Sequence, residues 1–538
     1  MKAFDYIIVG AGTSGCVLAN RLCQNPDNSV LLLEAGARDV HPYIHLPGAY
    51  SMNHKTGHDW GFSTEEQVHL NNRKIYLPRG KVMGGCSSTN AMAYVRGNKA
   101  DYDKWASMGN DGWSYEDVLP LFKKTEHYLD AKEGDNRFRG QEGELLVSEK
   151  TRFRTVYGDA FIDACKVLGM PENHDYNGAN QKGVGPFQFT IARGKRQSGA
   201  VAFIKPILKR SNLVISTKSL VEQIYIDNNV AKAVVYSKGG KTITATAKKE
   251  IIVCAGAFQT PQILMLSGIG DRQELATHKI DTRVELSGVG KNLQDHLFFG
   301  VGASVKNQDA LNHYIPMEGQ LKGLVQYLFS KTGPLNSSPL ESVAFLNIDQ
   351  PSDEVNFQMH FAPLNFGKGY DYSPYDLKTL PTKDGISILP TLLHPKSRGT
   401  VSIKSRNPKD HPLIQPNFLS EKDDLNQMIK GGELALEILK QDSLSKHIDE
   451  IVGPLDHSVE GIKDHLLKTV ETVYHPVGTC KMGSDEMAVV DHQLNVHGVE
   501  NLRVADASIM PKIVSGNTNA ACFMIGEKAA EMILKPTY

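Results

Sequence analysis

The sequence lacks the features that mark several large classes of protein. Its seven cysteines are scattered, odd in number and contain no C-x-x-C pair, which argues against a disulfide framework and against a zinc ribbon. No apolar run is long enough to span a bilayer. The formal net charge of −1 indicates neither a nucleic-acid partner nor attraction to a charged membrane surface.

Signatures of other catalytic classes are missing as well. There is no G-x-S-x-G elbow and no H-E-x-x-H pair. Gly240-Lys241-Thr242 resembles the end of a P-loop, but Val235 occupies the position of the first glycine. Four histidines form two pairs spaced by four residues, but prolines interrupt the helix that would align the first pair: His41, His45, His54 and His58. We therefore expect no metal site.

Length and composition indicate a globular protein of more than one domain. The chain has 538 residues, of which 41% are hydrophobic and 22% charged, and it is too long for one ordinary domain. The first strand-like run begins almost at Met1, so we expect no leader peptide. The expected location is the cytoplasm, with peripheral contact at the inner membrane face left open.

The most informative stretch runs from Phe4 to Glu34. Apolar residues lead to Gly10, which with Gly12 and Gly15 completes G-x-G-x-x-G at a strand-to-helix turn. These glycines allow a tight turn, close approach of a pyrophosphate, and packing of the helix on the strand. Glu34 ends the next apolar run, at the spacing where an acid reaches a ribose hydroxyl. The pattern predicts FAD or NAD rather than NADP, because an acid there disfavours a 2′-phosphate.

Further α/β signals are spread along the chain. Strands are expected at Glu250–Gly256 and Leu502–Asp506, with β alternation over Ser211–Ile226. Thr260 and Pro261 are interpreted as a helix cap and first turn. Helices are also expected near Asp424–Leu439 and Ala520–Leu534. This order predicts one discontinuous nucleotide-binding domain with a second domain inserted.

Five ordered motifs then carry a resemblance that covers essentially the whole chain. Besides the N-terminal turn, they are Pro78–Met92, Gly256–Gly270, Tyr474–Gly483, Val504–Pro511 and Ser515–Ala520. Together they resemble the glucose–methanol–choline (GMC) oxidoreductases, a family of flavoproteins. Within that family the chain looks most like bacterial choline-dehydrogenase-like alcohol dehydrogenases.

The resemblance implies a mixed α/β fold with two domains. Residues 1–155, 195–300 and 467–538 would form a Rossmann-type FAD-binding domain. Residues 156–194 and 301–466 would form a substrate-binding domain with an antiparallel sheet and helices. A homo-oligomer is one open alternative for the assembly.

The resemblance also implies FAD as the cofactor and the residues around it. Thr89 stands near the place where some members carry a histidine that binds flavin covalently, so we predict non-covalent FAD. Trp60 would belong to a lid over the flavin, Val221 would contact adenine, and Asn90 would lie near the isoalloxazine. The full set of expected cofactor residues is Gly10, Gly12, Thr13, Ser14, Gly15, Glu34, Ala35, Trp60, Arg79, Gly84, Gly85, Ser87, Asn90, Ala91, Met92, Ala93, Val221, Ala255, Gly256, Asp506, Ala507, Asn517 and Thr518.

By the same resemblance, the chain oxidises a primary alcohol by hydride transfer to flavin N5. His475 would accept the hydroxyl proton, a task that suits a side chain titrating near neutral pH, and Asn519 would be its partner. Glu341 is a candidate for holding the quaternary ammonium of choline. The electron acceptor would be a quinone, a dye or O₂. An O₂-using oxidase, a choline dehydrogenase, a hydroxynitrile lyase and a light-driven decarboxylase remain alternatives.

Overall fold

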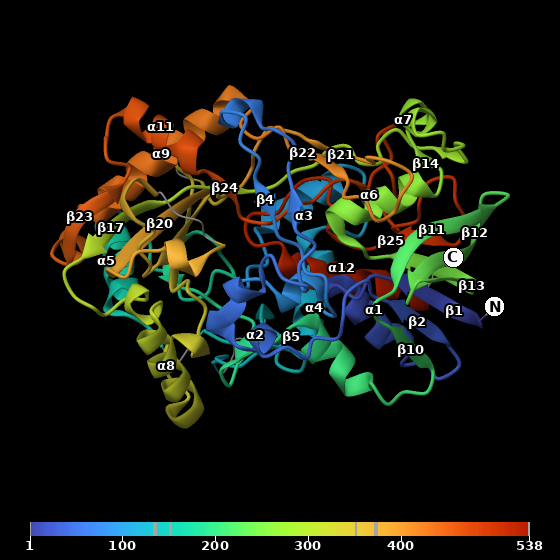
Figure 1. Cartoon of the computed structure of the whole chain (residues 1–538), viewed down its shortest axis with the longest axis horizontal. Helices are drawn as coiled ribbons and strands as arrows, with labels where there is room; N and C mark the ends of the chain where they lie inside the picture. The colour runs from blue at the N-terminus through green and yellow to red at the C-terminus, as the bar shows by residue number, and fades with distance from the viewer. Residues whose placement is uncertain (1, 133–136, 150–152, 350–351, 371–374, 536–538) are drawn as a thin grey trace.

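The structure, a computed structural model, describes residues 2–132, 137–149, 153–349, 352–370 and 375–535. Two large sheets stand side by side, with the long connecting segments between them (Figure 1). The first sheet has the order β10-β2-β1-β13-β12-β11, and β25 also pairs with β13. Its strands are β10 (Leu213–Ser216), β2 (Val30–Leu33), β1 (Lys2–Val9), β13 (Lys241–Val253), β12 (Val230–Lys238), β11 (Leu220–Asp227) and β25 (Leu502–Val504).

The central strands of this sheet are parallel and buried. β1 pairs in parallel with β2 and with β13, and β2 pairs in parallel with β10. The strand residues Ile7, Ile8 and Val9 are at most 2% exposed, as expected for parallel strands covered on both faces. The α/β prediction and the expected strands of Ser211–Ile226 are confirmed.

The second sheet is antiparallel throughout. Strand β16 pairs with β20 and with β24. Both β16 and β24 lie just outside the ranges expected for the substrate-binding domain. Helices α5 and α9 pack on it. Its strands are β23 (Ile448–Gly453), β17 (Val301–Val305), β20 (Gly385–Leu392), β19 (Phe357–Ala362), β18 (Ser342–Leu346), β7 (Gly183–Pro186), β16 (Leu297–Phe298) and β24 (Glu471–Thr472).

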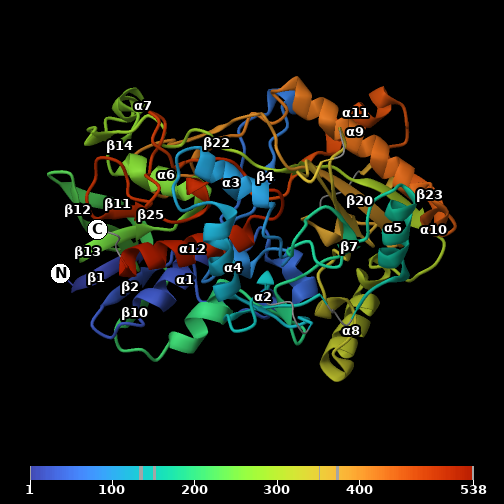
Figure 2. The same ribbon diagram turned by 180° about the vertical axis from the view of Figure 1, so that it is seen from behind.

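Helices cover both sheets, and the remaining strands form short two-stranded pairs. Figure 2 shows α12 between α1 and α4 on one face of the first sheet. The α-helices are α1 (Thr13–Leu22), α2 (Pro42–His45), α3 (Lys99–Ser107), α4 (Tyr115–Thr125), α5 (Val156–Val167), α6 (Gly256–Leu266), α7 (Arg272–Thr277), α8 (Met317–Val325), α9 (Lys422–Leu439), α10 (Asp442–Ser445), α11 (Val459–Thr469) and α12 (Asn519–Leu534). The short strands are β3 (Phe62–Ser63), β4 (Tyr76–Leu77), β5 (Glu126–Tyr128), β6 (Leu145–Val147), β8 (Ile191–Ala192), β9 (Lys195–Arg196), β14 (Ile269–Gly270), β15 (Val284–Glu285), β21 (Thr400–Ser402) and β22 (Leu413–Gln415).

One predicted helix start was wrong. Helix α6 begins at Gly256, so Thr260 and Pro261 lie inside it rather than at its cap and first turn. Gly256 adopts a φ of +85°, which lets the chain turn directly from β13 into the helix. Pro261 lacks the N–H that would bond to the carbonyl of Ala257, and that carbonyl instead accepts a bond from Thr479 Oγ1 at 2.6 Å.

Candidate active site

The glycine-rich turn after β1 has the tight geometry expected from the sequence. A Cβ on Gly10 would lie 2.5 Å from the carbonyl oxygen of Cys254, and one on Gly15 would lie 2.0 Å from that of Gly10. Only glycine fits at either position. A Cβ on Gly12, in contrast, would have no neighbour closer than 3.8 Å. Gly12 therefore leaves its side open to the cavity described next.

A cavity of about 320 Å³ extends from this turn to residues of the second sheet. It is bounded by Gly12 and Glu34, which follow β1 and β2 of the first sheet, and by Phe298 and Leu389 of the second sheet. Most of the expected site residues line it: Gly10, Gly12, Thr13, Ser14, Glu34, Ala35, Trp60, Arg79, Gly85, Asn90, Ala91, Met92, Ala93, Val221, Ala255, Gly256, His475, Asp506, Ala507, Asn517, Thr518 and Asn519.

Three expected cofactor residues support the cavity wall from behind instead. Gly15 packs α1 against the turn, as described above. Gly84 has a φ of +89°, and a Cβ on it would lie 2.2 Å from Ser88 Oγ. The hydroxyl of Ser87 donates to the carbonyl of Gly84 at 2.5 Å and accepts from the N–H of Gly199 at 2.9 Å. Gly84 and Ser87 thus hold the loop, and of the glycine pair only Gly85 faces the cavity.

Glu341, the expected substrate residue, does not line the cavity. Its carboxylate accepts bonds from the N–H and the hydroxyl of Thr155, both at 2.8 Å. Burial raises its pKa to about 7. The preceding residue, Leu340, lines the cavity in its place. Side chains alternate between the faces of an extended segment, so a shift of one residue turns the carboxylate away.

Glu34 is fixed at the nucleotide-binding end of the cavity. Its two oxygens accept bonds from the N–H of Ala11 at 3.0 Å and of Gly36 at 2.7 Å. Burial raises its pKa to about 7, although these two hydrogen bonds favour the ionised form. Each carboxylate oxygen has a second lone pair, so Glu34 can still accept a bond from a ribose hydroxyl.

Two helix N-termini open into the same region. Helix α1 starts after Gly12 and helix α12 after Thr518, and neither has a side-chain cap. Unpaired N–H groups and the positive end of the helix dipole favour an anion at such a position. The hydroxyl of Thr13 donates to Asn519 Oδ1 at 2.9 Å and joins the two helix starts. With the open side of Gly12 and the acid at Glu34, these residues fit a dinucleotide such as FAD.

His475 is the titratable group at the other end. The backbone N–H of His475 donates to Asp295 Oδ1 at 2.8 Å. This bond fixes the backbone after β24. Burial, followed by the nearby His296, lowers the pKa of His475 well below its ordinary value of 6.5. The imidazole is therefore neutral at physiological pH and has one nitrogen lone pair with which to accept a proton.

The structure places Asn517 beside His475, rather than the expected partner Asn519. Asn517 Nδ2 lies 3.2 Å from His475 Nε2, whereas Asn519 accepts the bond from Thr13. Helix α12 begins at Asn519, so the first helical turn directs this side chain to the start of α1. Asn517 precedes the helix and faces the histidine.

Several cavity residues were not singled out from the sequence. His360 lines the cavity, and its Nε2 is buried without a hydrogen-bond partner among the residues that the structure describes. Burial lowers the pKa of His360 to about 4. Tyr50, His54 and Tyr474 also line the wall. Tyr50 and His54 lie outside the five motifs, and Tyr474 opens one of them without an assigned role, so only the fold shows that they reach the cavity.

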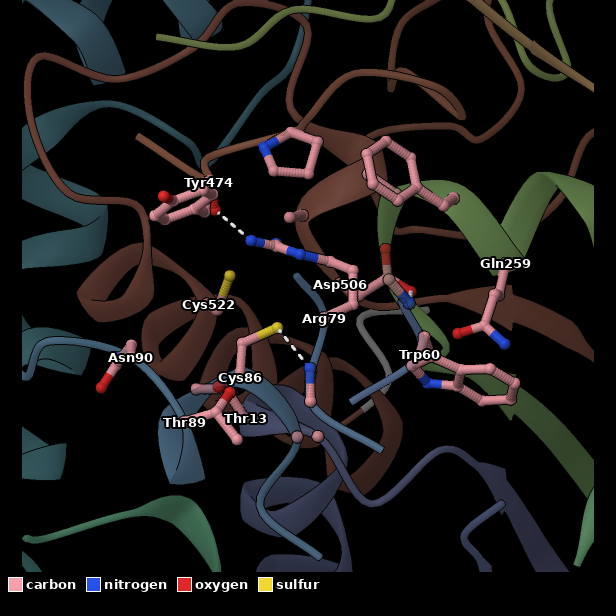
Figure 3. A pocket seen from close by; sticks show the side chains of 18 of the residues that line it. Thr13, Trp60, Arg79, Cys86, Thr89, Asn90, Gln259, Tyr474, Asp506 and Cys522 are labelled. Atoms are coloured by element: carbon pink, nitrogen blue, oxygen red, sulfur yellow. Dashed lines mark hydrogen bonds between the residues drawn. The ribbon is translucent and has the colours of Figure 1, made fainter. Parts of the chain in front are cut away.

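Trp60 and Arg79 close another part of the wall (Figure 3). Trp60 stacks on Phe62, with ring centroids 5.8 Å apart, and the ammonium of Lys81 lies 4.4 Å from its ring centroid. Arg79 Nη2 donates to the carbonyl of Tyr474 at 2.5 Å, which ties this segment to the residue before His475.

The wall near the second sheet is mainly apolar and aromatic. It includes Met92, Phe298, Leu340, Leu389 and Val473. Among the described residues, Glu34 and Asp506 are the only acids that line the cavity. Asp506 is bound to the N–H groups of Gly256 and Ser508 and to the hydroxyl of Thr260.

Comparison with known proteins decides the family. Two family models, both described as GMC oxidoreductase, match residues 4–298 and 395–526. The chain belongs to the GMC oxidoreductase family. It is 41% identical to an alcohol dehydrogenase [acceptor] of Pseudomonas putida, over 99% of this chain and 96% of that protein. It is 39% identical to an oxygen-dependent choline dehydrogenase of Sinorhizobium fredii, over 98% of this chain and 95% of that protein.

Solved structures of other GMC oxidoreductases have the same fold. Pyridoxine 4-oxidase from Mesorbium loti superposes with a TM-score of 0.88 at 28% identity, covering 99% of this chain and all of that one. Formate oxidase from Aspergillus oryzae RIB40, solved in connection with FAD modification, gives 0.91 at 27% identity, covering 99% and 98%. GMC oxidoreductases depend on FAD, so this chain is an FAD-dependent oxidoreductase. No helix among the described residues is both long and apolar enough to cross a membrane.

Proposed function

We propose that this GMC oxidoreductase oxidises a primary alcohol to an aldehyde. The observation that carries the proposal is His475, a buried, neutral imidazole in the cavity with Nε2 beside Asn517. Bound FAD supplies the hydride acceptor for such a reaction. The protein must place the alcohol and remove its hydroxyl proton. Asn517 and His475 are the groups proposed for these two tasks.

His475 Nε2 is the proposed proton acceptor. The hydroxyl proton of the alcohol would pass to this nitrogen, and bound FAD would supply the acceptor for the carbinol hydride, so that the alcohol would become an aldehyde. Asn517 carries an amide N–H that does not ionise and can hold the substrate oxygen. General base catalysis of this kind contributes roughly 10²- to 10⁴-fold in rate.

The proposed substrate has an uncharged, apolar body. Burying a quaternary ammonium without a compensating charge is costly, and no described acid lines the wall near the second sheet. Glu341 is bound to Thr155 instead. Choline is the second candidate, because the chain resembles choline dehydrogenases and aromatic side chains such as Tyr50 can attract a cation. The ratio of kcat/KM for 1-octanol or benzyl alcohol over choline distinguishes the two.

The proposed cofactor contacts follow the shape of the cavity. Glu34 would accept a hydrogen bond from a ribose hydroxyl, and Val221 would contact adenine. The starts of α1 and α12 would face the pyrophosphate. Asn90 and Ala507 would lie by the isoalloxazine.

We also propose that the FAD is not covalently attached. Thr89 lines the cavity at the position where some relatives carry a linking histidine. Its hydroxyl does not form such a bond under ordinary conditions. Acid precipitation should release the yellow colour into the supernatant, and colour retained in the pellet would contradict the proposal.

The electron acceptor is proposed to be a quinone reached at a lipid surface. Helix α8 and the turn after it project from the body (Figure 1) and expose an apolar stripe, in which Met317 and Phe329 are each 85% exposed. The stripe comprises Met317, Leu321, Leu324, Val325, Leu328 and Phe329. Lys322 and Lys331 flank it, as basic residues flank interfacial helices that lie on anionic lipid.

Two packing contacts connect α8 with the cavity wall, the first between α8 and Pro334–Asn336. The turn Pro334–Asn336 packs against Pro47–Asn53, and Tyr50 in that segment lines the cavity. A lipid surface held at α8 would therefore lie near one wall of the active site. O₂ is the alternative acceptor. Re-oxidation of reduced enzyme by air, compared with re-oxidation by a quinone in vesicles, separates them.

Addition of an alcohol without oxygen also tests for activities other than alcohol oxidation. A hydroxynitrile lyase or a light-driven decarboxylase would leave the flavin oxidised when an alcohol is added without oxygen. An alcohol dehydrogenase or oxidase would bleach it. The presence of His475 and Asn517 together in the cavity favours the redox reaction.

A further inference from the structure

His296 has no part in the function proposed above, yet it touches the proposed base. It is fully buried and follows Asp295, which holds the backbone of His475. His296 Nδ1 lies 3.0 Å from His475 Nδ1. His296 Nε2 lies 2.9 Å from the carbonyl oxygen of Leu393. Both nitrogens of one histidine are therefore engaged, one by the base and one by the backbone.

The backbone carbonyl decides where the protons are. A carbonyl oxygen can only accept a hydrogen bond, so His296 Nε2 must carry its proton toward Leu393. Burial lowers the pKa of His296 to about 3, and a neutral imidazole carries only one N–H. Its Nδ1 is then a bare acceptor, and the short contact is satisfied when His475 Nδ1 carries the proton.

The opposite assignment fails at both ends of the chain of contacts. If His296 Nδ1 carried the proton, its Nε2 lone pair would face the lone pairs of Leu393. His475 would then carry its proton on Nε2, facing the N–H of Asn517 at 3.2 Å. In the orientation that the structure shows, Asn517 Oδ1 accepts from Gln358 Nε2 at 3.2 Å, so the amide N–H of Asn517 points to His475. With the proton of His475 on Nδ1, every contact pairs a donor with an acceptor. With that proton on Nε2, a donor faces a donor at Asn517 and an acceptor faces an acceptor at Leu393.

We propose that His296 is a positioning residue that holds the proton of His475 on Nδ1 and so leaves the Nε2 lone pair facing the substrate. The inference rests on the proposed role of His475 as base. It gives that base its orientation, because only an unprotonated Nε2 can take the proton of the alcohol. The anchor of the arrangement is a main-chain carbonyl, which does not titrate.

His296 also affects the protonated state. When His475 gains a proton, its Nδ1–H bond to His296 becomes charge-assisted and stronger. Positive charge nearby acts in the opposite sense: His296, His360 and Arg79, when charged, lower the pKa of His475, and His394 and His360 lower that of His296. Because the pKa of His296 is itself lowered to about 3, His296 is neutral when it accepts this bond. Asp295 bonds to the N–H of His475.

Two substitutions separate the acceptor at Nδ1 from the donor at Nε2. His296→Gln keeps an amide N–H that can reach Leu393 and loses the acceptor for His475. His296→Asn places an amide oxygen near the position of Nδ1 and keeps that acceptor. In anaerobic stopped-flow reduction, we expect His296→Gln to slow flavin reduction by about 10²-fold. We expect His296→Asn to stay within about tenfold of the wild type, with the alcohol Kd little changed in both.

His465→Gln is the matched control. His465 is also a buried histidine whose Nε2 lies 2.9 Å from a backbone carbonyl, that of Gly300, but it does not line the cavity. It should lose comparable stability and keep its rate of reduction. Equal rates in His296→Gln, His296→Asn and wild type would overturn the inference. If wild-type flavin is not bleached by any alcohol, the proposed function itself fails.

A direct observation does not depend on activity or on the folding of the His296 variants. In wild-type protein labelled with ¹⁵N-histidine, two-bond proton–nitrogen correlations distinguish a protonated Nδ1 from a protonated Nε2. His475→Gln identifies the signals of His475. A protonated Nδ1 and bare Nε2 on His475 is the expected result, and a proton on Nε2 would overturn the inference.

Discussion

Asn517 Nδ2 lies 3.2 Å from His475 Nε2, and the two side chains come from separate segments that meet at the wall of one cavity. Asn519, two residues further on, instead accepts a bond from Thr13. The two asparagines therefore serve different parts of the same site. Asn517 belongs to the proposed chemistry, and Asn519 belongs to the proposed pyrophosphate end.

Substitution of each asparagine by alanine tests this division. Asn517→Ala should slow anaerobic flavin reduction by roughly tenfold or more, because the substrate oxygen loses a donor. Asn519→Ala should mainly weaken FAD retention, because the link between the starts of α1 and α12 is lost. The measurements are stopped-flow reduction and flavin content after dialysis. The division would be wrong if Asn519→Ala slowed reduction while Asn517→Ala released the cofactor.

Gly12 and Gly15 should respond differently to a single added methyl group. A Cβ at Gly15 would lie 2.0 Å from a backbone oxygen, whereas one at Gly12 meets nothing within 3.4 Å. Gly15→Ala should therefore lower the free energy of unfolding by about 1–3 kcal/mol through overpacking, or by more because the neighbouring atom is rigid backbone. Gly12→Ala should keep the thermal stability of the apoprotein and weaken FAD binding. Equal losses of apoprotein stability in the two variants would contradict this account.

Glu341 should affect the pH dependence of stability and leave catalysis alone. Burial raises its pKa from 4.5 to about 7, so the folded state favours the protonated form. That contribution is fully present below pH 4.5 and is lost as the pH rises through about 7. Its upper size is about 3 kcal/mol, at 1.36 kcal/mol per pKa unit.

Glu341→Gln removes this titration. Denaturant unfolding should show the variant gaining stability relative to wild type between pH 5 and pH 8, with kcat/KM for an apolar alcohol almost unchanged. Asp159→Asn, at an exposed position near the same carboxylate, is the control and should show a much smaller pH effect. A large loss of activity in Glu341→Gln would place the carboxylate back in the substrate site.

The apolar stripe on α8 should hold the protein on lipid. Leu321→Glu together with Phe329→Glu should abolish co-sedimentation with vesicles containing anionic lipid, because two charges would enter the interface. Leu455→Glu, at an exposed apolar position between β23 and α11, should leave binding unchanged. Activity with a soluble dye should be the same in all variants. Vesicle binding that survives the double substitution, or a dimer that dissociates on it, would reject a lipid partner.

The sequence was most informative where function depends on local order. The glycine turn, its strand and its acid lie within one short stretch, so their geometry follows from residue spacing. Gly10 and Gly15 have the tight environments that the pattern requires. The resemblance carried by the other motifs likewise indicated segments that line the cavity. The glycine turn could be predicted from spacing because neighbours in sequence are there also neighbours in space.

The errors lie where side-chain direction or a distant contact decides. Whether Asn517 or Asn519 meets His475 depends on the residue at which α12 begins. The side chain of Leu340 lines the cavity, and the side chain of the adjacent Glu341 therefore points away from it. His296 and His475 are 179 residues apart in sequence, and no spacing rule connects them. Thr260 and Pro261 resembled a helix start because a left-handed glycine earlier in the chain cannot be recognised from its type alone.

The most direct test of the central claim is anaerobic reduction of the bound flavin by an apolar primary alcohol, compared between wild type and His475→Ala. We expect the wild-type flavin bands to bleach and the variant, with equal FAD content, to bleach at least about 10²-fold more slowly. An unchanged rate in His475→Ala would remove this residue from the proposed role. A fully loaded wild-type flavin that no alcohol bleaches would contradict the assignment as an alcohol-oxidising enzyme.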